Sequence, residues 1–157
     1  MTGDGKGAHE LFSMMNPVNK SDTPEKRDIY RTEPYAVAAD VYSSSECPGR
    51  GGWTWYTGAA GWLYRLGTEA ILGLCLKGDE LVFNPCVPSH WERWSVEYRY
   101  KRAVYSIEFS NPEKVSNGTA TVEHNGKVLS GNILKLSGSN ARHHVRVTLK
   151  TGDPKTG

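Results

Sequence analysis

The stretch RGGWTWYTGAAGW, Arg50–Trp62, is the most unusual segment of this 157-residue chain. It holds four of the 17 glycines and three of the five tryptophans. Glycine is costly to order and tryptophan carries a large apolar surface with one hydrogen-bond donor, so this concentration needs a physical reason. The segment leads into a predicted helix from about Tyr56 to Leu72. That helix ends at Gly73, a residue suited to the left-handed turn that follows many helices.

The start of this helix has the properties of an anion site. Thr57 and Gly58 fall in the first turn, where backbone N–H groups have no intrahelical partner and the helix dipole favours negative charge. Gly58 lets a ligand approach the backbone, and Thr57 adds a hydroxyl donor. Trp53 and Trp55 supply flat apolar faces that can stack on sugar rings. One interpretation is an oxyanion such as phosphate bound beside a carbohydrate. The other is a glycine-rich helix packed tightly against a neighbour, with the tryptophans in a core.

Composition narrows the class of protein. Charged residues make up 23%, hydrophobic residues 38%, and the mean hydropathy is −0.55, values that exclude a disordered tail. No apolar run is long enough for a membrane-spanning helix. The net charge of +2 is too small to suggest a nucleic-acid partner, and none is expected. The first seven residues lack the apolar core of a secretory signal, so we expect a cytoplasmic location.

Cysteines and histidines give no sign of a metal site. Cys47, Cys75 and Cys86 form no CxxC motif, so free thiols are expected rather than a zinc or redox site. In a strand, His143 and His144 would point to opposite faces, which argues against a shared metal ion. No partner motif accompanies His9, His90 or His124.

The chain divides into two unlike parts near Gly73. The residues up to Gly73 carry seven basic and nine acidic side chains, and the rest carry 12 and eight. In the first part, we predict helices over Ala8–Met15 and Glu33–Tyr42 before the one from Tyr56. The polar segment Asn19–Thr32, with Pro24 inside it, is predicted to be mostly loop. The last helix is expected to turn Ala60, Leu63, Gly67 and Ile71 inward.

The second part has the alternating pattern of strands. Asn125-Gly126 indicates a type I′ hairpin, and several short strands with turns between them suggest an antiparallel sandwich. Residues 150–157 are predicted to be a loose tail. The predicted strands are Leu74–Lys77, Glu80–Phe83, Trp94–Tyr100, Tyr105–Phe109, Thr121–Glu123, Lys127–Leu129 and Val145–Leu149.

Several segments together resemble a known family. Arg50–Trp62, with Leu63–Arg65 and Glu69–Leu74 after it, resembles the C-terminal part of glycoside hydrolase family 94. This family contains cellobiose phosphorylases and the phosphorylase-like domain of cyclic β-1,2-glucan synthases, and the similarity is strongest to the synthase branch. The resemblance covers residues 7 to 150. Other segments that match in order are Glu10–Val18, Thr32–Tyr42, Gly78-Asp79, Asn84–Pro88, Trp91, Tyr98–Tyr100 and Ile107–Pro112.

The resemblance implies an α+β fold. Residues 1–75 would be the last helices of an incomplete (α/α)6 catalytic barrel. Residues 76–150 would form an antiparallel, jelly-roll-like β-sandwich, followed by a tail at 151–157.

The resemblance also implies a chemistry. Members of the family use inorganic phosphate to cleave a β-glucosidic bond with inversion, or run the reverse reaction, and one carboxylic acid protonates the leaving oxygen. Thr57 and Gly58 match the family's phosphate-binding pair, and Glu33 lies in a segment on its sugar-binding side. Trp53 and Trp55 are candidates for the same cleft. No cofactor is expected, since phosphate is a co-substrate. The expected partner is a β-linked glucan or gluco-oligosaccharide.

Departures from the family pattern limit what this chain can do. Ala59 stands where a serine or threonine is usual, and Asn84 where an aspartate is usual. Near the candidate site, the carboxylates Glu33, Asp40, Glu46 and Glu69 show no spacing that selects a catalytic pair. The family's catalytic acid, and its phosphate-binding arginine and histidine, match no residue of this chain and are expected upstream of it.

These observations support three hypotheses. The first is a C-terminal fragment of a glycosyl-transferring enzyme, inactive alone, whose partner is the missing N-terminal part of the barrel. Such a fragment would be cytoplasmic, or the cytoplasmic part of a membrane-bound synthase. The second is a non-catalytic glucan-binding module that uses the aromatic residues of the second part. The third is an inactive gene remnant.

Overall fold

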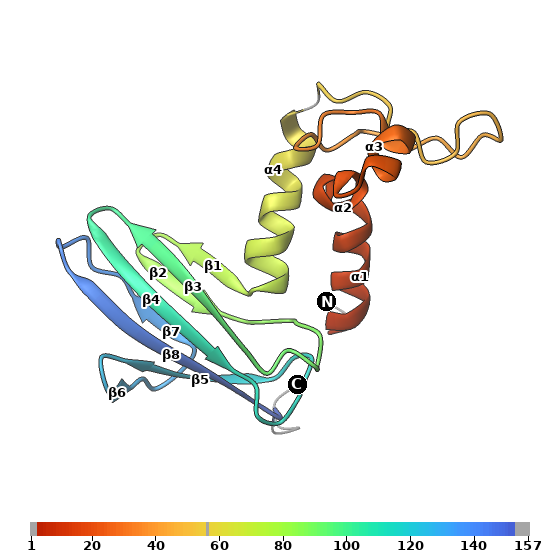
Figure 1. The fold of residues 1–157 in the computed structure, drawn as a ribbon. Helices are drawn as coiled ribbons and strands as arrows, with labels where there is room; N and C mark the ends of the chain where they lie inside the picture. The colour runs from red at the N-terminus through yellow and green to blue at the C-terminus, as the bar shows by residue number, and fades with distance from the viewer. Residues whose placement is uncertain (1–2, 56, 153–157) are drawn as a thin grey trace. The chain divides into compact units, whose positions relative to one another are not determined.

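The computed structural model describes residues 3–55 and 57–152 and shows an α+β chain (Figure 1). Two compact units make up the chain. One consists of residues 9–67, and the other combines residues 1–8 with residues 68–157. The predicted domain division at residue 75 remains a prediction. No helix in the described ranges is long and apolar enough to cross a membrane.

Short helices dominate the unit of residues 9–67. Helix α1 (Gly5–Met15) extends the predicted first helix by three residues at its start, and α2 (Pro17–Ser21) and α3 (Pro24–Tyr30) follow it. The prediction of a loop over Asn19–Thr32 is therefore wrong. Each short helix begins with a proline in its first turn, after a capping side chain that accepts a backbone N–H bond. The proline that suggested a loop is a helix start.

The predicted helix over Glu33–Tyr42 is also wrong. This segment is irregular and lies antiparallel to a later one, with a β-bridge between Val41 and Gly51. The backbone N–H of Ala39 donates to the Trp53 carbonyl and that of Tyr42 to the Arg50 carbonyl, each at 2.8 Å. Bonds to a distant segment replace the intrahelical bonds that a helix would need.

The predicted third helix forms in two parts. Helix α4 (Thr57–Arg65) continues as the π-helical segment η1 (Leu66–Ile71), and Gly73 follows with a φ of +68°. The predicted start at Tyr56 lies outside the described residues. Of the expected inward residues, Ile71 is buried and Leu63 and Gly67 are half-buried. Ala60 is exposed, which corrects that part of the prediction.

Two sheets form the second unit. Strands β1 (Leu74–Lys77), β2 (Glu80–Phe83) and β7 (Ile133–Lys135) make an antiparallel sheet in the order β1-β2-β7. The larger sheet has the order β3-β4-β8-β5-β6. Its strands are β3 (Arg93–Tyr100), β4 (Ala103–Ser110), β5 (Thr119–His124), β6 (Lys127–Val128) and β8 (Arg142–Lys150).

The larger sheet is mixed rather than purely antiparallel as predicted. Strand β8 runs parallel to β4 and antiparallel to β5, and it lies between them. Because β4 and β5 run in opposite directions, any strand placed between them must be parallel to one of the two. The local hairpins form as predicted, and positive φ angles at Asn125 (48°) and Gly126 (83°) confirm the type I′ turn.

The core of this unit lies between alternating faces of its strands. The Phe83 ring of β2 and the Phe109 ring of β4 meet edge to face with centroids 6.3 Å apart, so both sheets contribute to one core. On β4, Ala103, Tyr105, Ile107 and Phe109 are buried. The aromatic residues of β3 share this inward face, with Trp94 stacked on Phe109 at 5.0 Å. The aromatic face of β3 is thus directed to the core, not to a sugar in solvent.

The predicted tail begins later than expected. Strand β8 runs to Lys150, and the next residue is also held, because the N–H of Thr151 donates to an Oε of Glu113 at 2.7 Å. Residues 153–157 lie outside the described ranges. The three cysteines are free thiols, as expected.

Gly73 is expected to tolerate no side chain. A methyl group there would lie 2.1 Å from the backbone carbon of Asn84, in addition to the cost of the positive φ. Gly78 has a similar φ of +65° but open space around it, so it is a matched control. We expect Gly78→Ala to lower the free energy of unfolding by about 1–2 kcal/mol. Gly73→Ala should cost about 1–3 kcal/mol more. Urea denaturation would measure both, and equal losses would contradict the backbone clash.

Candidate functional site

The candidate site is carried by the irregular segment between α3 and α4. Tyr30, at the end of α3, is 3% exposed, and its carbonyl accepts the Gly51 N–H at 2.8 Å. Its hydroxyl accepts the Ala38 N–H at 3.4 Å. A methyl group on Gly51 would lie 2.5 Å from the Thr32 methyl and 3.0 Å from the Tyr30 ring. Gly51 therefore permits a close contact that fixes both ends of this segment.

Asp40 accepts hydrogen bonds from the backbone just before the tryptophan pair. Its carbonyl accepts the Gly52 N–H at 3.0 Å, and its Oδ1 accepts the Trp53 N–H at 3.3 Å. A methyl group on Gly52 would lie 2.3 Å from the same carboxylate oxygen. The glycine pair before Trp53 is thus required by packing around Asp40 and Thr32. Sequence reasoning assigned Asp40 no role beyond being one of four carboxylates near the candidate site, and its contacts with Gly52 and Trp53 became visible only in the structure.

The two predicted sugar-stacking residues are brought together at the surface. Trp53 is 58% exposed and Trp55 is 80% exposed. Their ring centroids are 5.9 Å apart at an interplanar angle of 43°. An indole with this exposure leaves much of its apolar surface in water, which is unfavourable unless something else covers it. These tryptophans are not core residues of the described chain.

Glu33 lies in the same segment. It follows Thr32, whose methyl group is the near neighbour of Gly51. The Glu33 carbonyl accepts the Ala36 N–H at 3.0 Å in a turn, and the side chain is exposed. Its carboxylate is free to accept hydrogen bonds from hydroxyl groups.

The predicted phosphate residues lie at the start of α4. Thr57 begins the helix, and Gly58 is exposed. Within the part of the chain that the structure describes, no atom comes within 4 Å of a methyl group built on Gly58 or on Gly61. By contrast, a methyl group on Gly67 would meet the Phe12 ring at 3.3 Å. Tight packing therefore accounts for the glycine at 67 but not for those at 58 and 61. Among the described residues, there is open space beside Gly58.

His143 and His144 lie on opposite faces of β8, as predicted, but His143 also has a partner on another strand. His143 faces the core and His144 is exposed on the other face, so they do not converge. Sequence reasoning missed the partner of His143. Nε2 of His124 lies 3.1 Å from His143 Nδ1, and the His143 ring stacks on Tyr105 at 4.5 Å. This pair joins β5 to β8, strands whose sequence spacing gave no signal. Within the described ranges, no group of three or more His, Cys, Asp or Glu side chains could hold a metal ion.

Comparisons with known proteins agree with the sequence motifs. Residues 1–73 match the model of the glycosyl hydrolase 94 superfamily, catalytic domain. Curated relatives align with most of the chain and are glycosyl-transferring enzymes. These relatives are carbohydrate-active enzymes. Within that class, the chain belongs to the glycosyl hydrolase 94 superfamily.

Three relatives illustrate the similarity. Cyclic beta-(1,2)-glucan synthase NdvB of Rhizobium meliloti is 43% identical over 78% of this chain and 5% of that protein. The N,N'-diacetylchitobiose phosphorylase of Vibrio proteolyticus is 33% identical over 83% of this chain and 16% of that enzyme. Solabiose phosphorylase of Paenibacillus borealis is 26% identical over 95% of this chain and 19% of that enzyme. The chain thus spans less than a fifth of the length of each.

The histidine pair is expected to make the sheet sensitive to acid. Burial lowers the pKa of His124, and a positive charge on His143 lowers it further. The unfolded chain then binds protons more readily, so the pair's stabilising contribution is present above pH of about 6.5 and is lost as the pH falls below it. We expect His124→Gln to reduce the loss of stability between about pH 7 and 5, measured by denaturant unfolding. His144→Gln, on the exposed face, is the control. If the free energy of unfolding of the His124→Gln variant falls with pH as steeply as that of the unaltered chain, the histidine pair is not the source of the acid sensitivity.

Proposed function

We propose that this chain is the C-terminal part of a glycosyl-transferring enzyme of the β-glucan phosphorylase or cyclic β-1,2-glucan synthase type. In this proposal it supplies part of a phosphate and sugar site. The observation that carries the proposal is the open start of α4 beside two exposed tryptophans. Gly58 has no neighbour that explains it, while the segment before it is held in place by close glycine contacts.

The phosphate would bind at the backbone of Thr57 and Gly58. The first N–H groups of α4 have no intrahelical acceptor, and the dipole of a nine-residue helix favours an anion at this end. Several relatives are named phosphorylases, enzymes that use phosphate to cleave a glycosidic bond. Phosphate would be a co-substrate, not a cofactor.

The sugar would lie over Trp53 and Trp55, with Glu33 accepting bonds from its hydroxyl groups. An aromatic face matches the apolar C–H surface of a sugar ring, and a carboxylate matches its hydroxyl edge. In an inverting reaction, phosphate takes the place of the activated water, and a carboxylic acid protonates the leaving oxygen. We assign that acid to the part of the enzyme outside these 157 residues. No residue of this chain is proposed to be catalytic.

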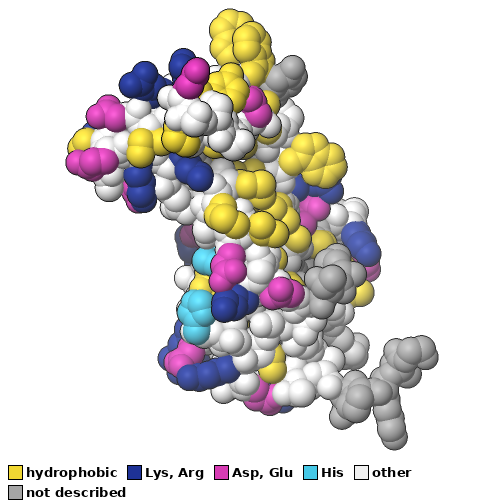
Figure 2. Space-filling view, turned by 90° about the vertical axis from the view of Figure 1, so that its right-hand side faces the viewer, with side chains coloured by type: hydrophobic (Ala, Val, Ile, Leu, Met, Phe, Trp, Pro, Cys, Tyr) yellow, Lys and Arg dark blue, Asp and Glu magenta, His cyan; other side chains and the backbone are white. Residues whose placement is uncertain are grey.

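The surface of residues 9–67 supports an incomplete barrel. Large apolar side chains, coloured yellow with the other hydrophobic residues in Figure 2, are exposed on its helices and loops. Exposed apolar surface of this extent commonly marks an interface. In a complete (α/α)6 barrel, the remaining helices would cover it, and residues 76–150 would form the C-terminal β-sandwich. The enzyme would be cytoplasmic, or a cytoplasmic part of a membrane-bound synthase. Apart from the two tryptophans of the candidate sugar site, the exposed side chains are Leu11, Met14, Met15, Val18, Ile29, Tyr35, Val41, Tyr42, Trp62 and Tyr64.

Phosphate binding can be tested with two matched glycines. Neither Gly58→Ala nor Gly61→Ala creates a clash, so both variants should fold. We expect millimolar phosphate to shift the backbone amide resonances of residues 57–59 in two-dimensional NMR, at constant ionic strength set with chloride. Gly58→Ala should weaken this response about tenfold, while Gly61→Ala should leave it unchanged. Equal responses from the unaltered chain and from both variants would refute a phosphate site at Gly58.

Sugar binding can be tested with two exposed tryptophans. Trp53 lies in the candidate site, and Trp62, 70% exposed on α4, lies outside it. We expect a β-1,2-gluco-oligosaccharide at millimolar concentration to change the tryptophan fluorescence of the chain. Trp53→Ala should remove most of the change and Trp62→Ala little of it. A response that survives Trp53→Ala would place the sugar elsewhere.

A further inference from the structure

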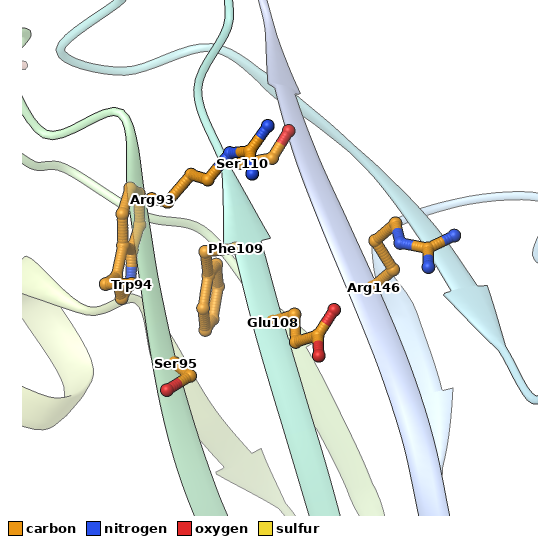
Figure 3. Close-up of a pocket in the computed structure, with 7 residues that line it drawn as sticks. All are labelled: Arg93, Trp94, Ser95, Glu108, Phe109, Ser110 and Arg146. Carbon is orange, nitrogen blue, oxygen red and sulfur yellow. The ribbon is translucent and has the colours of Figure 1, made fainter.

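A groove on the outer face of the larger sheet has no assigned role. It is lined by residues of β3, β4 and β8 and has a volume of about 650 Å³. Figure 3 shows Arg93, Glu108 and Arg146 extending from these three neighbouring strands. Trp94 and Phe109 alternate with these residues along the strands, and their rings stack on each other on the core face. The floor of the groove is therefore the backbone of the sheet.

The size and lining of this groove indicate the kind of ligand. Its volume falls within the range of about 300–1,000 Å³ that is typical of small-molecule sites. Such sites are mostly apolar, whereas the side chains directed into this one are charged or carry hydroxyl groups. They are Arg93, Ser95, Glu108, Ser110 and Arg146. A ligand with many hydroxyl groups fits this lining better than an apolar one.

Two charged side chains that line the groove, one cation and one anion, are not engaged in ion pairs within the described residues. Glu97 is engaged by Arg99 at 3.0 Å and by Arg142 at 3.4 Å, and Glu123 is engaged by Arg146 at 3.4 Å. Arg93 and Glu108 have no hydrogen-bond or ion-pair partner among the described residues. The groove thus offers the Arg93 guanidinium as a donor and the Glu108 carboxylate as an acceptor, on neighbouring strands. A hydrogen bond and the charge of Lys114 lower the pKa of Glu92, and the charge of Arg93 also lowers it.

This combination distinguishes a neutral sugar from an anion. Each hydroxyl group of a sugar both donates and accepts, so a diol can accept from Arg93 and donate to Glu108, with Ser95 and Ser110 as further partners. A phosphate or carboxylate would be attracted by Arg93 and repelled by Glu108, and the positive charge of Arg146 is offset by its ion pair with Glu123 at 3.4 Å. We propose that this groove binds a neutral gluco-oligosaccharide, at a site separate from Trp53 and Gly58.

A second hollow extends the groove across the sheet. It has a volume of about 170 Å³ and shares Glu108 and Arg146 with the first. Its further polar side chains are Ser106, Glu123 and His144. A polar surface that continues over four strands suits several sugar units in a row. The choice of a glucan as the sugar rests on the proposed function, whereas the choice of a neutral polyhydroxyl ligand rests on the groove.

The test maps amide shifts on the whole chain during titration with a β-1,2-gluco-oligosaccharide. We expect saturable shifts at residues 93–95, 108–110 and 146 in addition to those at 53–58. Glu108→Gln keeps the shape of the side chain and weakens its acceptor, so affinity measured at the groove should fall about fivefold or more. Glu97→Gln makes the same change on the same face outside the groove, and it should leave that affinity unchanged.

The outcomes separate the two proposals. Shifts at 53–58 without any at the groove would overturn this inference and leave the proposed function standing. Shifts at the groove alone would support the inference and count against the sugar site at Trp53. Groove shifts that are equal in Glu108→Gln and the unaltered chain would overturn it. Groove shifts caused by inorganic phosphate but not by the oligosaccharide would also overturn it, because the ligand would then be an anion.

Discussion

The close approach of Gly73 to the backbone of Asn84 and Pro85 joins the residues before β1 to the segment after β2. The Gly73 carbonyl accepts the Asn84 N–H at 2.8 Å, and the Ile71 carbonyl accepts the Cys86 N–H at 2.9 Å. The end of the helix is therefore bonded to the segment that leaves β2. This fixes the register of β1 on β2, where Leu74 faces Phe83 and both are buried. Only a residue without a side chain allows this backbone approach beside the first hairpin.

Sequence patterns predicted those parts of the fold whose partners are near in the chain. The hairpins of β1 with β2 and of β3 with β4, and the turn at Gly126, have adjacent partners and formed as expected. Glu33–Tyr42 has good local helix signals, but its backbone bonds with residues 50–53 instead. The parallel pairing of β8 with β4 likewise depends on a strand some 40 residues further along. No local rule reports such a distant partner.

In the candidate site, too, the sequence patterns did not reveal contacts between residues distant in the chain. A dense run of glycine and tryptophan marked the segment before α4 as unusual, but it did not decide between exposed tryptophans and tryptophans in a core. The sequence did not reveal that Gly51 and Gly52 serve packing while Gly58 faces open space. The His124–His143 pair and the polar groove are assembled from strands distant in sequence, so no motif announced them. The histidine at 143 was considered only with its chain neighbour, which faces the other way.

The central place of β8 has a consequence for the order of folding. Strands β4 and β5 each pair with β8 and not with each other. Until Lys150 has left the ribosome, both present unpaired edges, which are templates for association with other chains. The β3–β4 and β5–β6 hairpins can form during synthesis, but they become one sheet only when β8 enters between them. Assembly of this half is thus a late event with high contact order, and it is slow by comparison with its hairpins.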